Sequence, residues 1–353
     1  AVTLSVNPIV IAALSFTPQH LLVRAEMLAV GSTYPNIYTR FNGDAGSNYN
    51  VQVLTAYGTT KAAGGEADVT GIGLLGNIGP NANQWTPGEI LLPDALSTRT
   101  HKSALSYSGR YDAVVRTAAG RWASTAAITS VTLYAAPDSS FAPFAAGSTF
   151  ELCVVDESFN IDQDGDGQQI LGSDGTFSVG SISAADGDLV CIGNVRSDRE
   201  ANWDAVDMKL NSDATGGNYQ SQWLYAVDTG TQSYATTSSL QVADGLPDEN
   251  NAAGAFGAFV SQITNFSDGA DDRVVTTFSG AHAPAVPHGE VNFIWKRWNN
   301  TSAVTTVDYE ASNSSTGNFV VGSMLSTYAV PKNLIERQEI TGSTSDPTVV
   351  TFS

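Results

Sequence analysis

Two segments of the chain spell nearly the same turn. The sequence RFNGDAGSNY begins at Arg40, and KLNSDATGGNY begins at Lys209. Before each turn, residues that match between the segments recur at every second position, with polar neighbours, as in a half-buried β-strand. The matching positions are Ile37, Thr39 and Phe41 in the first segment and Val206, Met208 and Leu210 in the second. The sequence therefore predicts that one strand-and-turn unit occurs twice in the fold.

Other matches follow in the same order along the chain. Upstream, Leu21 and Val23 match Leu189 and Cys191. Downstream, the matched pairs are Trp122 with Trp298, Tyr134 with Tyr309, Phe144 with Phe319, Gly147 with Gly322 and Ser148 with Ser323. The spacing between partners drifts, as insertions and deletions in loops would make it. A repeat this long indicates duplicated domains rather than a solenoid.

Each repeated turn carries an aspartate, Asp44 or Asp213, that is followed by glycine. An Asx-turn, in which the side chain accepts a hydrogen bond from a nearby backbone N–H, explains both aspartates. Gly46 and Gly216 or Gly217 are expected to supply the positive φ of a tight hairpin. Binding of a metal or ligand by the two aspartates is the alternative, which short motifs leave open.

The segments between the matches are typical of an all-β protein. Each copy offers roughly eight short strands separated by turn residues, and the best helical candidate, PKNLIERQE from Pro331, is too short to carry a core. Strands without alternating helices favour antiparallel sheets. About 150 residues per copy suit a jelly roll better than an immunoglobulin-like sandwich. We predict two tandem antiparallel β-sandwich (jelly-roll-like) domains from an internal duplication.

The repeats also set the expected boundaries. The first sandwich is assigned to residues 1–157 and the second to 176–335, with an acidic linker over 158–175. Residues 336–353 are left as a C-terminal tail. Because unpaired strand edges recruit further strands, we expect the tail to add to a sheet of this chain or of a neighbour. A frayed terminus is the alternative.

Composition and charge limit the classes of function. Hydrophobic residues make up 42% of the chain and charged residues 14%, which suits packed cores. The formal net charge of −19 repels phosphate and anionic lipid, so neither nucleic acid nor a membrane is an expected partner. Cys153 and Cys191 belong to no metal-ligand pattern and are expected to be buried thiols. No basic n-region precedes the first apolar patch, so we expect synthesis in a cytoplasm without a cleaved leader.

The expected linker contains the opening of a calcium loop. Alternate aspartates on a curling backbone converge on one hard cation, and the glycine after them permits the sharp bend. The expected ligands are Asp162, Asp164, Asp166, the backbone carbonyl of Gln168, and Asp174 in place of the usual glutamate one position earlier. A flexible acidic linker explains the same residues equally well. If Ca²⁺ binds, it would stiffen the connection between the sandwiches.

The sequence shows no catalytic motif, because HExxH, a G-x-S-x-G elbow and a phosphate-binding loop are all missing. His282 and His288 could meet at one ion, but exposed histidines in a proline-rich loop are the commoner arrangement. A glycosidase needs two opposed carboxylates, which cannot be paired from sequence. Trp85 is the best candidate for stacking on a sugar, although an ordinary anchor under a loop explains it better, whereas the matched Trp122 and Trp298 indicate a core role. We therefore expect a protein that is not an enzyme.

The matched segments resemble a family of virion structural proteins of tailed phages, marine ones especially. In that family a VRSDR strand is followed by RFNxDxGxNY; here VRSDR begins at Val195 and KLNSDATGGNY follows. The segment ITSVTLYAAPDSSFAPFAAGSTFEL is similar to the closing strands of the family. The resemblance covers the ends of both copies and is poor in their middles. The first copy departs from it, with VRAEMLAV in place of VRSDR.

This resemblance implies a non-enzymatic component of a phage particle, made in the host cytoplasm and assembled into the virion. The expected role is a capsid decoration or cement protein on the outside of the shell. Its expected partners are other virion proteins, such as the major capsid or tail protein, and further copies of itself, first as a trimer. The alternative is a module on the tail or fibre that binds a glycan receptor through exposed aromatic residues.

Overall fold

The computed structural model shows an all-β protein. It describes residues 2–4, 9–12, 20–29, 34–76, 78–79, 84–110, 114–136, 144–155, 168–180, 182, 186–201, 203–248, 250–264, 266, 272–283, 288–312 and 316–331. Within these ranges there are 24 strands in four sheets, and one short 3₁₀-helix, η2 (Gly216–Asn218). All strand pairs are antiparallel, which confirms the predicted fold class. The C-terminal tail and the helical candidate after Pro331 lie outside the described residues.

The first half contains an eight-stranded sheet, in the order β1-β12-β3-β8-β9-β10-β5-β6, and a four-stranded sheet, in the order β2-β11-β4-β7. The strands are β1 (Val2–Leu4), β2 (Ile9–Ala12), β3 (His20–Met27), β4 (Asn36–Phe41), β5 (Tyr49–Tyr57), β6 (Thr60–Val69), β7 (Ile72–Leu75), β8 (Thr86–Leu92), β9 (Lys102–Arg110), β10 (Val114–Trp122), β11 (Ser130–Ala136) and β12 (Ser148–Val155). These twelve strands exceed the eight of a simple jelly roll.

The second half has sheets of the same two sizes, in the orders β13-β24-β15-β20-β21-β22-β17-β18 and β14-β23-β16-β19. The strands are β13 (Gln168–Ile170), β14 (Phe177–Val179), β15 (Asp186–Val195), β16 (Asp204–Leu210), β17 (Tyr219–Val227), β18 (Gly230–Thr236), β19 (Gln241–Leu246), β20 (Gly257–Thr264), β21 (Arg273–Ala283), β22 (His288–Trp298), β23 (Val307–Ala311) and β24 (Met324–Pro331). Strand β13 lies within the segment that the sequence assigns to the linker.

The two halves repeat one strand order, with β1 equivalent to β13, β12 to β24, and so on through both sheets. The pairing register agrees as well. Tyr49 faces Trp122 across β5 and β10, and Tyr219 faces Trp298 across β17 and β22. Residues of the two halves can therefore be matched one to one wherever strand and register correspond. Their origin by duplication stays a prediction.

One predicted match is wrong by a single position. Val131 faces Phe41 as Val307 faces Leu210, so the residue equivalent to Tyr309 is Leu133 and not Tyr134. Leu133 and Tyr309 are both buried in their cores. Because side chains alternate between the faces of a sheet, a shift of one residue exchanges core and surface. The sequence comparison aligned Tyr134 with Tyr309 because both residues are tyrosines.

Each half buries one hydrophobic core between its large and its small sheet. The alternating positions predicted from the sequence face these cores: Ile37, Thr39 and Phe41, like Val206, Met208 and Leu210, are fully buried. The matched Trp122 and Trp298 are 3% and 1% exposed, which confirms their core role. Cys191 is buried as expected, but Cys153 is partly exposed, and both thiols are free.

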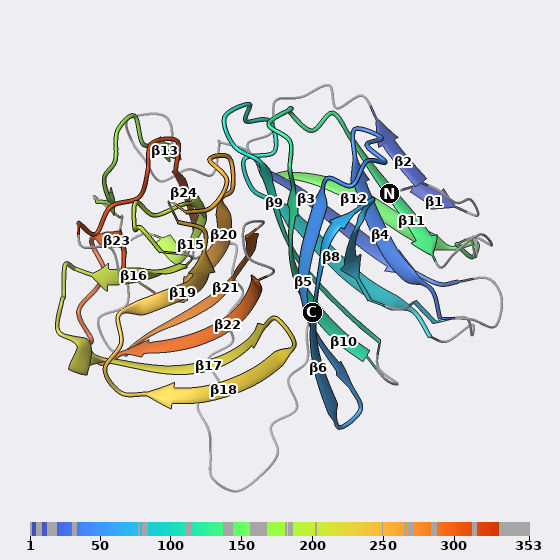
Figure 1. Ribbon diagram of the computed structural model, residues 1–353. Helices are drawn as coiled ribbons and strands as arrows, with labels where there is room; N and C mark the ends of the chain where they lie inside the picture. Colours follow the sequence, from blue (N-terminus) through green and yellow to red (C-terminus); the bar gives the residue numbers. More distant parts are fainter. Residues whose placement is uncertain are drawn as a thin grey trace, which may run out of the picture.

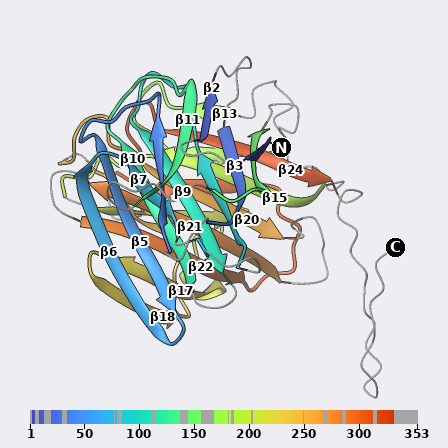
Figure 2. The same cartoon turned by 90° about the vertical axis from the view of Figure 1, so that its right-hand side faces the viewer.

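The two large sheets pack against each other through their outer faces, so the chain has four layers with both small sheets on the outside (Figure 1). Strands β5, β9 and β10 contact β20, β21, β22 and β17, and the strands of the two sheets cross rather than run parallel (Figure 2). A small apolar cluster lies at the crossing: Leu105, Ala119, Ala226, Ala258 and Val291. The packing is close there, since a Cβ added to Gly280 would lie 2.5 Å from the Cβ of Ala119.

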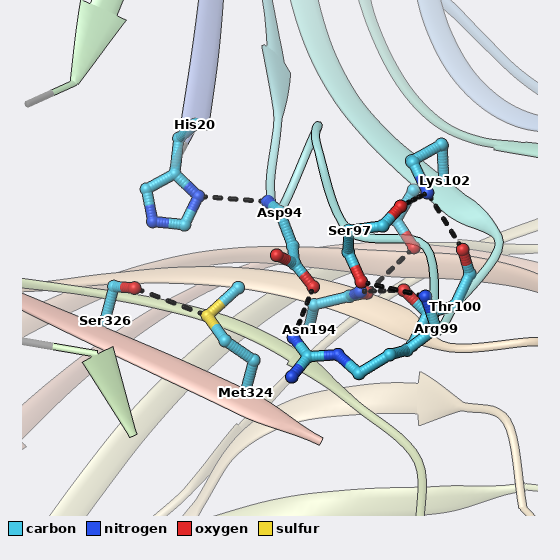
Figure 3. A network of polar contacts seen from close by, with 10 residues as sticks. His20, Asp94, Ser97, Arg99, Thr100, Lys102, Asn194, Met324 and Ser326 are labelled. Carbon is cyan, nitrogen blue, oxygen red and sulfur yellow. Dashed lines mark hydrogen bonds and ion pairs between the residues drawn. The ribbon is translucent and has the colours of Figure 1, made fainter. Parts of the chain in front are cut away.

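Polar contacts also join the halves, and Figure 3 shows the contact of Asn194 with Thr100. The Asn194 side chain donates to Thr100 Oγ1 (3.3 Å), and the Ser103 hydroxyl donates to Asn194 Oδ1 (3.0 Å). Nearby, His20 Nδ1 accepts a hydrogen bond from the Asp94 N–H (3.1 Å), and its ring meets Tyr328 of the other half edge-on. Burial lowers the pKa of His20 to about 3. The His20 imidazole is therefore neutral at the junction between the two halves.

Candidate functional site

The predicted calcium ligands fall largely outside the described part of the chain. Asp162, Asp164 and Asp166 are not among the described residues. Gln168 begins strand β13, and the Asp174 carboxylate accepts a hydrogen bond from the Val321 N–H (2.9 Å). Within the described residues, no group of three or more His, Cys, Asp or Glu side chains could hold a metal ion. The calcium loop stays a hypothesis.

The repeated turns are structural, as the Asx-turn predicts. Asp44 accepts hydrogen bonds from the Gly46 N–H (2.8 Å), the Asn48 side chain (2.9 Å) and the Trp122 indole (2.7 Å). Asp213 has the same three kinds of donor: the Thr215 N–H (2.9 Å), Asn218 (2.8 Å) and Trp298 (2.9 Å). Partial burial alone would raise the pKa of each aspartate, but these hydrogen bonds outweigh it and hold the pKa below its usual value.

The positive φ angles lie elsewhere than predicted. They occur at Asn42 (52°) and Gly43 (68°), and at Asn211 (52°) and Ser212 (55°), not at Gly46, Gly216 or Gly217. Asparagine tolerates this conformation, and its side chain ties the turn to a neighbouring loop. Asn42 Oδ1 accepts from the Thr129 N–H, and Asn211 Oδ1 from the Thr305 N–H, each at 2.7 Å.

The other residues singled out in the sequence have ordinary roles where they are described. Trp85 is partly buried, and a Cβ added to Gly147 would lie 3.2 Å from its ring, so Trp85 covers this glycine. His282 is 3% exposed at the junction, which contradicts the expected exposed loop. Residues 284–287, between the two histidines, lie outside the described part of the chain. No helix among the described residues is long and apolar enough to cross a membrane.

A different group of residues forms the best candidate site. It lies on the inner face of the second large sheet, where β19 covers β20, β21 and β22 and the strands β17 and β18 extend past it (Figure 1). We name it the acid–aromatic cluster: Trp223 and Tyr225 from β17, Tyr234 from β18, Asp244 from β19 and Glu290 from β22.

The aromatic side of the cluster is ordered by cross-strand pairing. Trp223 faces Tyr234 directly, and their rings stack at 5.2 Å with an interplanar angle of 13°. The Tyr225 ring stands nearly perpendicular to Tyr234, at 87° and 5.9 Å between centroids, and its hydroxyl donates to Gln232 Oε1 (2.7 Å). Trp223 is 1% exposed, whereas Tyr234 is 41% exposed. The cluster thus runs from a buried indole to a ring in contact with solvent.

The acidic side consists of two carboxylates held close together. An added Cβ at Gly245, whose φ is +70°, would lie 2.8 Å from Glu290 Oε2, so only glycine lets β19 pass this carboxylate. The neighbouring Asp244 accepts a hydrogen bond from the Gly245 N–H (2.8 Å). Burial raises the pKa of Asp244 to about 6; burial and the charge of Asp244 raise the pKa of Glu290 well above its usual value.

Three buried polar atoms on the same face have no hydrogen-bond partner: Ser221 Oγ, Trp223 Nε1 and Asn292 Oδ1. Ser221 and Trp223 are inward positions of β17, and Asn292 faces Tyr225 across the β17–β22 pair. The three residues are 5% exposed or less. Two donors and one acceptor on this face are thus without a protein partner, although buried polar groups are normally paired.

The first half serves as an internal control, because its fold is the same and the cluster is missing. By strand and register, Trp223, Tyr225, Tyr234, Asp244 and Glu290 correspond to Val53, Thr55, Gly64, Gly76 and Val114. None of these first-half residues is acidic or aromatic. The sandwich therefore forms without the cluster, so stability of the fold does not explain it.

A second polar feature is less suited to binding. A shallow depression of about 290 Å³ lies over β3, β8, β9 and β12. Its central cation is already paired, because Arg24 Nε lies 3.0 Å from Glu89 Oε1, and the exposed Tyr107 hydroxyl also bonds to Glu89. These groups satisfy each other and leave little for a ligand.

No family model and no curated protein matches the chain. Among solved structures, the chain is similar to the LG1-3 region of the laminin alpha2 chain at 9% identity and a TM-score of 0.23, over 93% of this chain and 65% of that one. The chain thus spans slightly less than two thirds of that structure's length. A similarity this weak supports no conclusion about function.

Proposed function

We propose that this chain is a non-enzymatic binding protein of a phage particle, and that its second sandwich recognises a glycan. The phage context comes from the resemblance of the repeated segments. The acid–aromatic cluster suggests a glycan as the ligand, because sugars offer an apolar ring face for stacking and hydroxyls for hydrogen bonds to carboxylates and amides. Tyr234 supplies an accessible ring, and Asp244 and Glu290 supply the polar groups.

The observation that carries the proposal is the contrast between the halves. Five positions that form the cluster in the second sandwich are aliphatic, small or hydroxyl-bearing in the first. In addition, the cluster combines features that reduce stability, namely unpaired buried polar atoms and adjacent carboxylates. Costly arrangements that the fold does not require are characteristic of binding sites.

A glycan array probed with the purified full chain tests this proposal. We expect retention of a restricted set of glycans, and loss of that signal in Tyr234→Ala. Tyr57→Ala is the matched control, because Tyr57 is 45% exposed against 41% for Tyr234 and lies at the equivalent hairpin of the first sandwich. Retained glycans incubated with the chain should release no new reducing ends. An array without signal, or equal signal from Tyr234→Ala, would refute the proposal.

A second role, attachment to the outside of a capsid, has its own observation. On the outer face of the second large sheet, Trp295 is 44% exposed and Val274 is 45% exposed. The ring centroids of Phe293 and Trp295 are 4.3 Å apart. Apolar side chains gathered on a surface often mark a protein contact. Co-sedimentation with capsids should weaken in Trp295→Ala and stay unchanged in Tyr234→Ala. Light scattering measures whether the chain forms the expected trimer.

A further inference from the structure

The charges that act most strongly on the two carboxylates of the cluster are also negative. Asp204 acts on Asp244, while Asp244 and Asp228 act on Glu290. Neutral groups also interact with them: Gln241 and the Gly245 N–H with Asp244, and Asn292 with Glu290. Two adjacent buried carboxyls either hold a proton, as their raised pKa values indicate, or ionise beside a cation, and the charges that act on this pair are all negative. A cation for the ionised form would therefore have to come from a ligand.

Lys296, a basic side chain on the same sheet face, is bound elsewhere. Lys296 lies further along β22, where its Nζ donates to the Ser239 carbonyl (2.5 Å) and sits 5.2 Å from the centre of the Tyr219 ring. The acid that acts on Lys296 is Asp207, which belongs to another strand of the small sheet. Lys296 is therefore committed to other partners and does not neutralise the cluster.

Beside the carboxylates stand two aromatic walls. The perpendicular rings of Tyr225 and Tyr234 form a corner, and the carboxylates of Asp244 and Glu290 are close enough to raise the pKa of both phenols, after the larger effect of burial. Aromatic faces attract organic cations, and such corners with a nearby carboxylate recognise ammonium groups. The rings and the acids thus favour the same kind of charge.

We propose that the acid–aromatic cluster binds the ammonium group of its ligand, either the primary ammonium of an amino sugar or the quaternary ammonium of a choline-type substituent. This inference rests on the proposed glycan site but specifies its chemistry: a positively charged ligand is bound, a neutral sugar is bound more weakly, and an acidic sugar is rejected. An ammonium group placed at the tyrosine corner supplies the missing counter-charge to Asp244 and Glu290.

Calorimetric titration of the full chain tests the inference at constant ionic strength. The probes are glucosamine, choline and tetramethylammonium, with glucose and N-acetylglucosamine as neutral controls of similar size. We expect the ammonium compounds to bind at least tenfold more tightly than the neutral sugars. The difference between glucosamine and choline decides which ammonium source the site prefers.

Two variants distinguish ammonium binding at the cluster from nonspecific attraction of cations to an acidic protein. Glu290→Gln keeps the shape of the side chain but cannot ionise beside a bound cation, so ammonium binding should fall at least tenfold, while a melting curve shows that the chain is folded. Glu89→Gln removes one charge from the first sandwich and should change nothing. Equal losses in both variants, or equal affinity for charged and neutral probes, would overturn the ammonium site.

The two proposals fail in different ways. If the array retains neutral glycans through Tyr234 and Glu290→Gln binds them normally, the glycan function stands and the ammonium site is wrong. If tetramethylammonium binds and the array is silent, the ammonium site stands and the glycan function is wrong.

Discussion

Replacing Asp244 by asparagine should make the protein more stable. Burial raises the pKa of this carboxyl from 3.8 to about 6. A raised carboxyl pKa means that the fold disfavours the carboxylate; its contribution to stability is complete below pH 3.8 and is lost as the pH rises through 6. At pH 7.5 the ionised group costs up to about 3 kcal/mol, from ~1.4 kcal/mol for each pKa unit. Asparagine is neutral at every pH, and its Oδ1 can still accept the hydrogen bond from Gly245.

Differential scanning calorimetry and urea unfolding measure the effect. For a chain of 353 residues, about 3 kcal/mol corresponds to a rise in melting temperature of about 4 °C. At pH 5 the gain should fall to about half, since the folded wild type is by then protonated and only the unfolded state ionises. Asp244→Asn should also weaken ammonium binding, because stability and binding make opposite demands on this group.

A matched control has the opposite sign. Asp213 has a lowered pKa because Trp298, Asn218 and Thr215 donate to it, so Asp213→Asn should reduce stability at pH 7.5. The reasoning about the cluster would be refuted if Asp244→Asn melted at or below the wild-type temperature at pH 7.5. A gain that did not change between pH 7.5 and pH 5 would equally exclude the ionised carboxylate as its cause.

Four further predictions concern the junction, the repeated turns and the linker. His20 has a pKa lowered to about 3, so its contribution to stability is complete above pH 6.5 and is lost towards pH 3. Between pH 7 and pH 5 it should account for about 2 kcal/mol, and urea unfolding of His20→Gln should be less acid-sensitive; equal acid sensitivity would contradict this. Gly280→Ala forces a Cβ to within 2.5 Å of Ala119 and should cost about 1–3 kcal/mol, whereas Gly217→Ala, with open space around it, should melt near wild type. Trp122→Phe and Trp298→Phe each remove an indole donor to an aspartate and should lower stability by a similar ~1–2 kcal/mol; clearly unequal losses in chemical unfolding would argue against equivalent turns. Calorimetry in millimolar Ca²⁺ should show binding heat if the segment 162–174 is a calcium loop, and chelator should then lower the melting temperature; no heat and no shift would exclude it.

Local patterns in the sequence were enough to predict the class of fold and the repeated turn. Alternation at every second position places Ile37 and Phe41, like Val206 and Leu210, on the inner face of a strand, whatever the strand later pairs with. In the Asx-turns, Asp44 and Asp213 each accept a hydrogen bond from the backbone N–H of the residue two positions later, Gly46 or Thr215. Such features involve few residues close in the chain, so the sequence alone determines them.

The candidate site was decided only by tertiary structure. Trp223, Asp244 and Glu290 come from three strands of two sheets, and nothing in their local sequence shows that they meet. Their meeting depends on the register of β17 with β22 and on the position of β19 over the large sheet. The packing of the two large sheets likewise depends on small residues such as Gly280 and Ala119, which have no distinctive pattern. Contacts between distant strands follow from the register of whole sheets, and a one-residue slip, as at Tyr134, exchanges the faces of a strand.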